Sequence, residues 1–590
     1  MKENIHSMND TPKQSSTQPW SVDARTWVAL LTLLAFALRS YGFWWGKPYD
    51  FHNDEAFVIV HTIKMLRHVK AGGLPDPETM IYGVWPFYQL GLVGEVTRTV
   101  VDALGHMLGI ERNIPLMYVG RLMSALYGTL GTVALYVLGK RMFDRGTGLW
   151  AAAFWAVMPL SVRDSHFATV DIQFSVWLVL TYIALLNIAK RVNMRDYAWA
   201  AVMMGLALAT RLSALPIFGV FFIAMVVQRW KSERIDSSLL DALLRTLKSP
   251  ALYGTVLTAV LLWAFLSIPV LDDLPAHLAG DTNSDLNVQG LVARGEIRPL
   301  YTIQFELTRP YIYHLRHLFP WAMTWPLALL AYAGWVYSTW KLFRGNRMDV
   351  LLAAWTLPYF ITVGGWYVKF FRYIIPLLPF MALYAARLIV HARSLSQSNA
   401  VNRMRQGVAV IIFLGAFVFS IAYLHIYSRP DTRLQTLMWI KKYIPPHSTI
   451  MLEFDASNKF AIHPEWYGLD QYQLRVLNHY EVNGKVGKFW QMPPVSPEEK
   501  WEYMIQTLDR ADYVVISEAW ARVFPKLPNR FPAEATFYQK LFDGRLGYRL
   551  VAVFQECPQI GPLRFCDENA EMSWRYFDHP IMYIFQRQAP

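Results

Sequence analysis

The sequence lacks the motifs of nucleotide-dependent and zinc-dependent enzymes. It contains no Cys/His spacing that fits zinc, no Walker loop, no dinucleotide-binding glycine fingerprint and no Gly-x-Ser-x-Gly elbow. Only two of its 590 residues are cysteine, and charged residues make up only 17% of the chain. These absences argue against nucleotide-driven chemistry and against a soluble protein of ordinary composition.

Apolar and aromatic residues are abundant instead. Hydrophobic residues make up 54% of the chain, which includes 23 tryptophans, 31 tyrosines and 34 phenylalanines. This composition is typical of an integral membrane protein. The formal net charge is +12, but the basic residues lie at the ends of apolar segments and form no continuous patch, so we expect no nucleic-acid partner.

About eleven apolar runs are long enough to cross a bilayer as helices. No small-residue cleavage site follows the first run, which therefore predicts an uncleaved anchor. The sequence thus predicts a polytopic α-helical membrane protein. The predicted spans are about 26–45, 116–141, 147–162, 168–189, 196–210, 212–229, 251–270, 319–342, 349–364, 372–391 and 406–426.

The positions of lysine and arginine predict the orientation of these spans. If the N-terminus is cytoplasmic, every inner loop carries a basic cluster, as the positive-inside rule requires. An odd number of spans in the plasma or inner membrane then places the C-terminal region outside the cytoplasm. The clusters are Lys140, Arg141 and Arg145; Lys190, Arg191 and Arg195; Arg229, Lys231 and Arg234; Lys341, Arg344 and Arg347; and Arg393, Arg403 and Arg405.

The predicted first outer loop, residues 46–115, is too long for a simple connection. Its periodicity predicts amphipathic helices at 55–69 and 86–108, the second of them broken near Gly105. We expect both helices to lie on the membrane surface and to cover a cavity. A similar amphipathic segment is predicted on the inner side at 235–248.

Composition divides the chain into a polar, disordered cytoplasmic tail at 1–25, a transmembrane domain at 26–427 and an extracytoplasmic domain at 428–590. The last part has the pattern of a soluble α/β domain, in which helices pack against a small sheet. Its predicted helices are 432–444 and 496–510, the second opened by a capping box, and its predicted strands are 448–454, 513–517, 548–555 and 581–587.

Both cysteines, Cys557 and Cys566, fall in this last domain. A close pair confined to the outer side predicts a disulfide that closes a short loop, with a stabilisation of roughly 2–3 kcal/mol. The alternative is two free thiols.

An acidic cluster follows the first apolar run and contains Asp54 and Glu55. Carboxylates at the mouth of a membrane helix are costly unless they face water or a partner, so they form a functional-site hypothesis. The structural alternative is that they lie in the first turn of a helix capped at Asn53, where the helix dipole favours negative charge.

Three further polar features share the predicted outer face. The turn at 163–171 contains two carboxylates, an imidazole and a guanidinium, although an ordinary polar turn would contain such residues too. The basic turn at 369–373 has an alternative role, in which its cations and aromatic rings anchor the chain at the membrane–water interface. Arg121, near the outer start of a span, requires an anionic partner because its charge would otherwise be buried alone.

Together these features resemble the protein O-mannosyltransferase and aminoarabinose (lipid A) transferase superfamily, membrane glycosyltransferases of the GT-C fold in glycosyltransferase families 39 and 83. The resemblance covers about residues 26–430. The region after residue 428 is similar to the extracytoplasmic domain of bacterial members and unlike the MIR domain of eukaryotic protein mannosyltransferases. The residues that carry the resemblance are Asp54, Glu55, Arg121, the segments 166–171 and 369–373, and Pro376.

The resemblance implies inverting transfer of a sugar from a polyprenyl-phosphate donor to an acceptor hydroxyl on the extracytoplasmic side. It implies that Asp54 is the catalytic base with Glu55 beside it, and that Asp171, or Asp164 in its place, is a second acid. The resemblance also implies a set of cations that hold the donor phosphate. They are Arg121, Lys369 and Arg372, with Arg163 and His166 as assisting residues.

No cofactor and no catalytic metal are expected, although several carboxylates facing one cavity are able to hold a divalent ion. The expected partners are the polyprenyl-phosphate sugar, membrane lipids and an acceptor that is a lipid, a glycan or a protein. Two other functions remain open. One is a lipid or sugar transporter or flippase, and the other is a non-catalytic envelope assembly protein.

Overall fold

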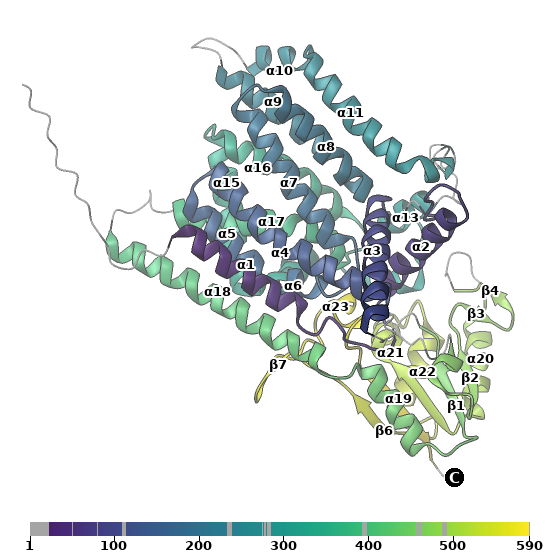
Figure 1. The fold of residues 1–590 in the computed structure, drawn as a ribbon. Helices are drawn as coiled ribbons and strands as arrows, with labels where there is room; N and C mark the ends of the chain where they lie inside the picture. The colour runs from purple at the N-terminus through teal and green to yellow at the C-terminus, as the bar shows by residue number, and fades with distance from the viewer. Residues whose placement is uncertain are drawn as a thin grey trace, which may run out of the picture.

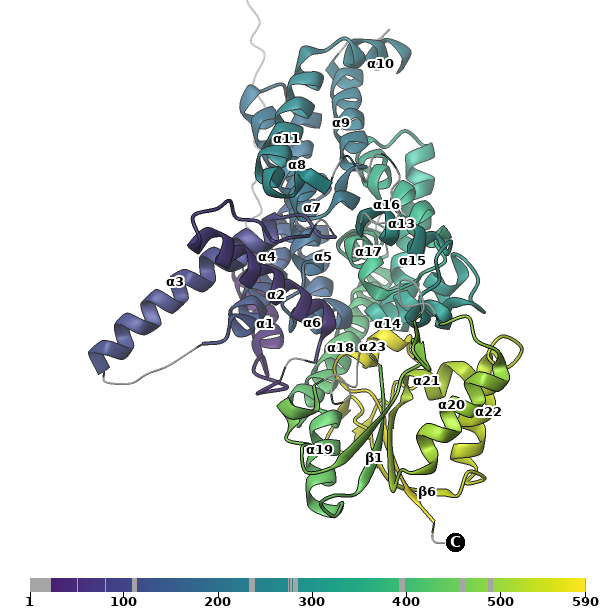
Figure 2. The same ribbon diagram turned by 90° about the vertical axis from the view of Figure 1, so that its right-hand side faces the viewer.

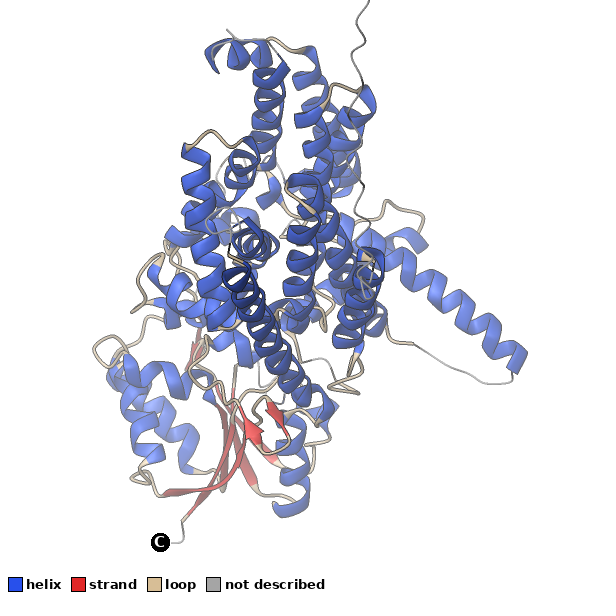
Figure 3. Cartoon of the chain, turned by 90° about the vertical axis from the view of Figure 1, so that its left-hand side faces the viewer, coloured by secondary structure: helices blue, strands red, loops and turns tan. Residues whose placement is uncertain are grey.

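The computed structural model describes residues 23–49, 51–79, 81–108, 114–232, 239–273, 275, 279, 285–391, 398–455, 460, 463–486 and 492–588. Residues 1–22 of the predicted tail lie outside these ranges. A large helical part is followed by a C-terminal domain that contains the strands (Figure 1). The strands gather at one end of the molecule, as Figure 3 shows.

Seven helical segments among the described residues are long and apolar enough to cross a membrane, judged by length and composition. The prediction of a multi-pass membrane protein is thereby confirmed. These segments are Leu116–Met142, Asp171–Lys190, Leu212–Trp230, Pro250–Leu271, Arg347–Gly365, Phe371–His391 and Asn399–Tyr443.

The remaining predicted spans correspond to helices that are shorter or less apolar. They are α1 (Ala24–Ser40), α5 (Arg145–Val157) with α6 (Pro159–Asp164), α8 (Met194–Thr210), and α15 (Trp325–Phe343) with the preceding α14 (Phe319–Met323). The number of eleven spans therefore stays a prediction.

Close packing organises the helical part around α4 (Leu116–Met142), α5 and α7 (Asp171–Lys190). A Cβ on Gly139 of α4 would lie 2.8 Å from the Cα of Gly148 in α5, so the two helices touch through their backbones. Helix α7 is buried along most of its length between α4, α8 and α9. The other helices of this part are α9 (Ile217–Ser232), α10 (Leu239–Leu247), α11 (Pro250–Ser267), α16 (Arg347–Gly365), α17 (Leu378–His391) and α18 (Asn399–Ser428).

Two helices between α1 and α4 match the predicted surface helices. Helix α2 (Asn53–Lys70) begins with its N-cap His52, whose side chain accepts a hydrogen bond from the Glu55 amide. Helix α3 (Trp85–Leu108) projects from the body of the molecule in Figure 2. It runs through Gly105 without interruption, so the predicted break there is wrong. A single glycine weakens a helix without ending it when the residues on both sides favour helix.

Short helical turns connect the longer helices on the side of the C-terminal domain. They are η1 (Leu212–Ala214), η2 (Ile268–Asp273), α13 (Asp285–Arg294), η3 (Leu300–Phe305), the π-helical turn η4 (His314–Leu318), η5 (Phe371–Tyr373) and η6 (Ile375–Leu377).

The C-terminal domain contains a five-stranded mixed sheet of order β2-β1-β5-β9-β6. Strands β2, β1 and β5 are parallel, and β9 pairs antiparallel with β5 and β6. The predicted strands are confirmed, whereas β2 was not predicted. The strands of the sheet are β1 (Thr449–Glu453), β2 (Gln473–Leu477), β5 (Tyr513–Ser517), β6 (Tyr548–Phe554) and β9 (Met582–Arg587).

Helix α19 packs against β6 and β9. Helix α20 packs against β2, and α22 packs against β6. Ser496 caps α20 by accepting a hydrogen bond from the Glu499 amide, which confirms the predicted helix start, whereas the Glu499 carboxylate accepts from Lys485. The helices are α19 (Thr432–Tyr443), η9 (Pro464–Tyr467), α20 (Pro497–Asp509), α21 (Glu518–Val523), η11 (Phe524–Lys526), α22 (Pro532–Phe542) and α23 (Met572–Tyr576).

Two small hairpins complete the domain. They are β3 (Glu481–Val482) with β4 (Lys485–Val486), and β7 (Gln559–Ile560) with β8 (Leu563–Arg564). The predicted disulfide between Cys557 and Cys566 is confirmed, and it closes the base of the second hairpin.

A buried polar network, which we call the Arg163 network, joins the C-terminal domain to the helical part. The Arg163 guanidinium donates to Asp164 at 2.7 Å and to the Ser573 carbonyl at 2.9 Å, and its Nε lies 3.3 Å from Asp578. The Asp578 carboxylate also accepts hydrogen bonds from Tyr423 and Tyr427 of α18. One guanidinium therefore connects the last turn of α6 to the C-terminal domain, and its partner Asp578 also binds α18.

This network predicts that Asp578→Ala destabilises the protein. Removing the carboxylate leaves the buried charge of Arg163 with one fewer anionic partner. Breaking such a buried pair typically lowers the free energy of unfolding by roughly 3–5 kcal/mol. The measurement is thermal unfolding of the purified protein, with limited proteolysis to detect release of the C-terminal domain. Asp543→Ala is the control, because its ion pair with Arg545 is exposed; equal stability of the two variants would contradict the role of the network.

Candidate active site

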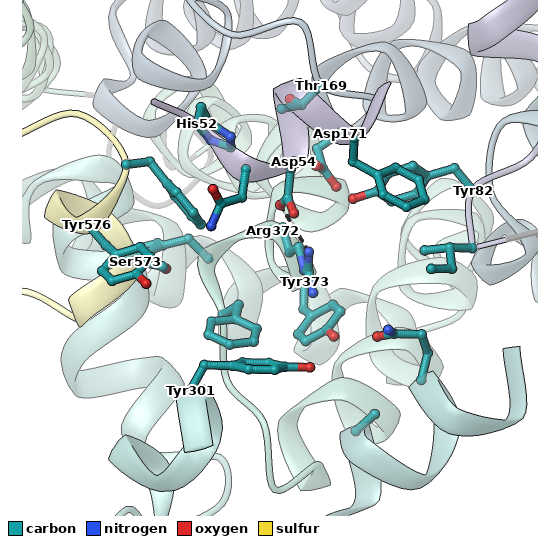
Figure 4. A pocket seen from close by; sticks show the side chains of 18 of the residues that line it. His52, Asp54, Tyr82, Thr169, Asp171, Tyr301, Arg372, Tyr373, Ser573 and Tyr576 are labelled. Carbon is teal, nitrogen blue, oxygen red and sulfur yellow. Dashed lines mark hydrogen bonds and ion pairs between the residues drawn. The ribbon is translucent and has the colours of Figure 1, made fainter. Parts of the chain in front are cut away.

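A cavity of about 650 Å³ lies between the helical part and the C-terminal domain. Its wall combines the start of α2, the segment before α3, the 163–171 turn, the residues around Arg211, α13, η3 and η5. The C-terminal domain contributes residues that follow β1 and β5 and residues of α23. Figure 4 shows the labelled side chains around this space.

Asp54 and Arg372 form an ion pair inside the cavity. Arg372 Nη1 lies 3.0 Å from Asp54 Oδ2, and about a quarter of each side chain remains exposed. Burial raises the pKa of Asp54, but the charge of Arg372 outweighs it and holds this pKa below the ordinary value. The carboxylate is therefore ionised at neutral pH and beside a cation. The structure thus brings together two of the residues predicted from the sequence.

A second ion pair joins Asp171 to Arg211 and also faces the cavity. Arg211 lies over the Tyr82 ring, 5.4 Å from its centroid. The Gly83 amide donates to the Thr210 carbonyl at 3.0 Å, which fixes the segment before α3 against the end of α8. Only glycine fits here, because a Cβ at this position would lie 1.9 Å from a backbone oxygen.

Arg211 was not predicted as a site residue. The available signal was its position, because it lies in a short turn between two predicted spans on the same side as Asp171. A lone arginine at a helix end also has an ordinary interfacial role, so the sequence does not separate the two possibilities.

Glu55 and Arg121 form a buried pair that does not line the cavity. Two parallel hydrogen bonds of 2.8 and 2.6 Å join the guanidinium to the carboxylate, and both side chains are at most 1% exposed. Arg121 also donates to the carbonyls of Phe43 and Trp45, and Glu55 accepts from the Ala168 amide. The anion that Arg121 requires is therefore Glu55, and the pair fixes α2 and α4 to the neighbouring turns.

The predicted cations Arg163 and Lys369 differ in their relation to the cavity. Arg163 lines the cavity together with Asp164. Its positive charge is paired with Asp164 and Asp578 in the Arg163 network. Burial raises the pKa of Asp164 to about 7, against the opposing effect of Arg163. Lys369 is buried outside the lining, where its Nζ donates to the Tyr367 carbonyl at 2.7 Å.

His166 also lies outside the cavity lining. Its two ring nitrogens are each 2.8 Å from a backbone carbonyl oxygen, those of Val162 and Tyr41, and the ring stacks on Tyr427. These contacts explain a packing role for the imidazole.

A metal site receives no geometric support within the described ranges. The group of metal-type ligands found there consists of Cys557, Cys566 and Glu568, and its two sulfurs form the disulfide. The cavity carboxylates Asp54, Asp164 and Asp171 are each paired with an arginine. The expectation that no metal takes part stays a prediction.

Residues 116–266 match the model of a family described as dolichyl-phosphate-mannose-protein mannosyltransferase. The chain resembles the GT-C membrane glycosyltransferases. This confirms the resemblance predicted from the sequence motifs. No curated protein matches the sequence.

Several solved structures are similar to this chain at low identity. An oligosaccharyltransferase from Archaeoglobus fulgidus has 14% identity and a TM-score of 0.48 over 88% of this chain and 72% of that chain. ArnT from Cupriavidus metallidurans, bound to undecaprenyl phosphate, has 12% identity and a TM-score of 0.45 over 95% and 98% of the two chains. Arabinofuranosyltransferase AftD from Mycobacteria has 16% identity and a TM-score of 0.38 over 97% and 40%.

The Glu55–Arg121 pair predicts a specific pattern in a double-mutant cycle. Arg121→Met leaves a buried carboxylate unpaired and is expected to destabilise the protein by roughly 3–5 kcal/mol. Adding Glu55→Gln removes that charge, so the double variant should be more stable than Arg121→Met alone. Thermal unfolding of the three variants and the wild type measures the coupling. Additive effects of the two substitutions would contradict a structural pair.

Proposed function

We propose that the protein is a membrane glycosyltransferase that moves a sugar from a polyprenyl-phosphate donor to an acceptor hydroxyl. The observation that carries this proposal is the Asp54 carboxylate beside the Arg372 guanidinium in one cavity. Sugar transfer from a lipid phosphate needs a group that takes the acceptor proton and a cation that receives the leaving phosphate. The name of the matching family also refers to a polyprenyl-phosphate sugar, dolichyl-phosphate-mannose.

In the proposed reaction Asp54 accepts the proton of the acceptor hydroxyl. The acceptor oxygen forms a bond to the anomeric carbon while the bond from that carbon to the phosphate oxygen breaks. The electron pair of the broken bond leaves with the polyprenyl phosphate, and the anomeric configuration is inverted because the displacement is direct.

Arg372 and Arg211 are the proposed phosphate ligands. Both guanidinium groups line the cavity, and each is already held in place by a carboxylate. Arginine suits a phosphate because its planar fork donates two parallel hydrogen bonds. Asp171 keeps Arg211 oriented toward the cavity. The family resemblance implied Arg121 and Lys369 as further phosphate ligands. Neither residue lines the cavity, so this proposal does not include them.

The position of the charges favours a transferase over a transporter. Asp171 is the first residue of α7, and Arg211 follows the last residue of α8. Transporters usually bind their substrates near the middle of the membrane, at broken helices. Here the proposed site lies at helix ends beneath a folded domain, where a donor lipid and a polar acceptor are able to meet.

We further propose that the N-terminus is cytoplasmic and that the C-terminal domain and the cavity are extracytoplasmic. Helix α4 supports this orientation, because Arg121 near its start lies on the cavity side while Lys140 and Arg141 occupy its last turn. Basic residues at the opposite end from the cavity agree with the positive-inside rule.

The proposal predicts that Asp54→Asn abolishes transfer. Losing a general base typically lowers the rate by about 10²–10⁴-fold, and the protein should still fold because Asp54 faces a cavity. The measurement is release of radiolabelled sugar from a polyprenyl-phosphate donor in reconstituted membranes. Asp102→Asn is the control, because Asp102 belongs to an exposed ion pair on α3.

The pH dependence of the wild type identifies the base. The pKa of Asp54 lies below its ordinary value of 3.8, so its carboxylate persists as the pH falls, and transfer should continue down to the limit of folding. A loss of activity near pH 7 would instead assign the base to Asp164, whose pKa is about 7.

A further inference from the structure

We propose that Ser573, Gln304, Tyr301 and Tyr576 form an acceptor subsite, and that this subsite takes a sugar ring whose hydroxyl is glycosylated. The inference rests on the proposed function and adds the chemical class of the acceptor. Figure 4 shows Ser573 and Tyr576 on one side of Asp54, and Tyr82 and Asp171 on the other. The cavity therefore has one end at Tyr82 and Asp171, where the donor is proposed to bind, and a second end to which α23 of the C-terminal domain and η3 contribute.

Glu571 positions one neutral hydrogen-bonding group, the Ser573 hydroxyl, at this second end. Glu571 as a residue is 2% exposed, and its carboxyl group accepts a hydrogen bond from the Ser573 hydroxyl. Ser573 and Gln304 both line the cavity. A buried acid thus holds the Ser573 hydroxyl in place on the wall, and the Gln304 amide lies on the same wall. Both groups suit the hydroxyls of a sugar.

Asp164 belongs to the same end of the cavity. One Arg163 guanidinium donates to the Asp164 carboxylate and to the Ser573 carbonyl, so these two cavity-lining residues are neighbours. The carboxylate adds an acceptor for hydroxyl donors. The same guanidinium connects this group to the C-terminal domain, which places the subsite at the junction of the two parts.

Aromatic rings supply the remaining surface of the subsite. Tyr301 and Tyr576 line the cavity, and the Tyr301 ring is stacked on Phe370 with centroids 6.3 Å apart. Tyr480 and Trp520 of the C-terminal domain line the cavity as well. The C–H face of a sugar ring packs well against an aromatic face, while its hydroxyls point to the surrounding polar groups.

The charges argue against an anionic acceptor at this end. The charge of Arg163 is already matched by Asp164 and Asp578, so this guanidinium is not available to an anionic acceptor. An extended peptide acceptor is also disfavoured, because the edge strands β2 and β6 contribute no residue to the cavity lining. A neutral polyhydroxylated ring satisfies both the polar and the aromatic groups.

The test uses the full-length protein in nanodiscs with a radiolabelled polyprenyl-phosphate sugar. Three conditions are compared: a panel of octyl hexosides and pentosides, a peptide rich in serine and threonine, and buffer alone. Buffer alone reports slow donor hydrolysis, which does not depend on the acceptor subsite. The expected result is transfer to at least one octyl glycoside and none to the peptide.

Variants then assign the subsite. Tyr576→Ala and Gln304→Ala should each raise the KM for the glycoside by roughly three- to ten-fold. Tyr576→Phe keeps the ring and should have the smaller effect. Glu571→Gln tests the positioning role and should raise the same KM. Tyr443→Ala is the control, because Tyr443 is exposed outside the cavity lining.

Two results would overturn the subsite. One is transfer to the peptide but to no glycoside, and the other is a glycoside KM that is the same in all folded variants, as checked by thermal unfolding. A wild type that cleaves no donor under any condition would overturn the proposed function itself, and the subsite with it. Donor hydrolysis without transfer to glycosides would overturn only the subsite.

Discussion

The buried guanidinium of Arg163 is the interaction on which the rest of the site depends. It joins the last turn of α6 to the C-terminal domain, and the Asp578 carboxylate that it faces binds α18. A charge in such a place is tolerated only when its hydrogen-bonding capacity is satisfied, so the network specifies one docked arrangement. The cavity exists because of that arrangement, since the C-terminal domain forms one of its walls.

The arginines near the cavity divide into two kinds by burial. Arg121 is 1% exposed and is satisfied by Glu55 and by backbone carbonyls, so it acts on structure. Arg372 and Arg211 keep 23% and 14% of their side chains exposed and face the cavity. Their partners leave part of each guanidinium open to the cavity, which is the property that a ligand for a phosphate requires.

Local structure could be predicted well from the sequence, and the pairing of side chains could not. The helix predicted at 116–141 is Leu116–Met142, and the strand predicted at 513–517 is Tyr513–Ser517, because apolar periodicity is a local signal. Asp54 and Arg372 are 318 residues apart, and Glu55 and Arg121 are 66 apart. Their partners follow from tertiary proximity, which is why the sequence assigned Arg121 to a phosphate and overlooked Arg211.

The most direct test of the account is a cryo-EM structure of the protein in nanodiscs with bound polyprenyl phosphate. The central claim is that Arg372 and Arg211 receive the donor phosphate beside Asp54. The account predicts phosphate density in contact with both guanidinium groups, inside the cavity and within reach of the Asp54 carboxylate. Phosphate density against Arg121 or Lys369, or outside the cavity, would contradict it.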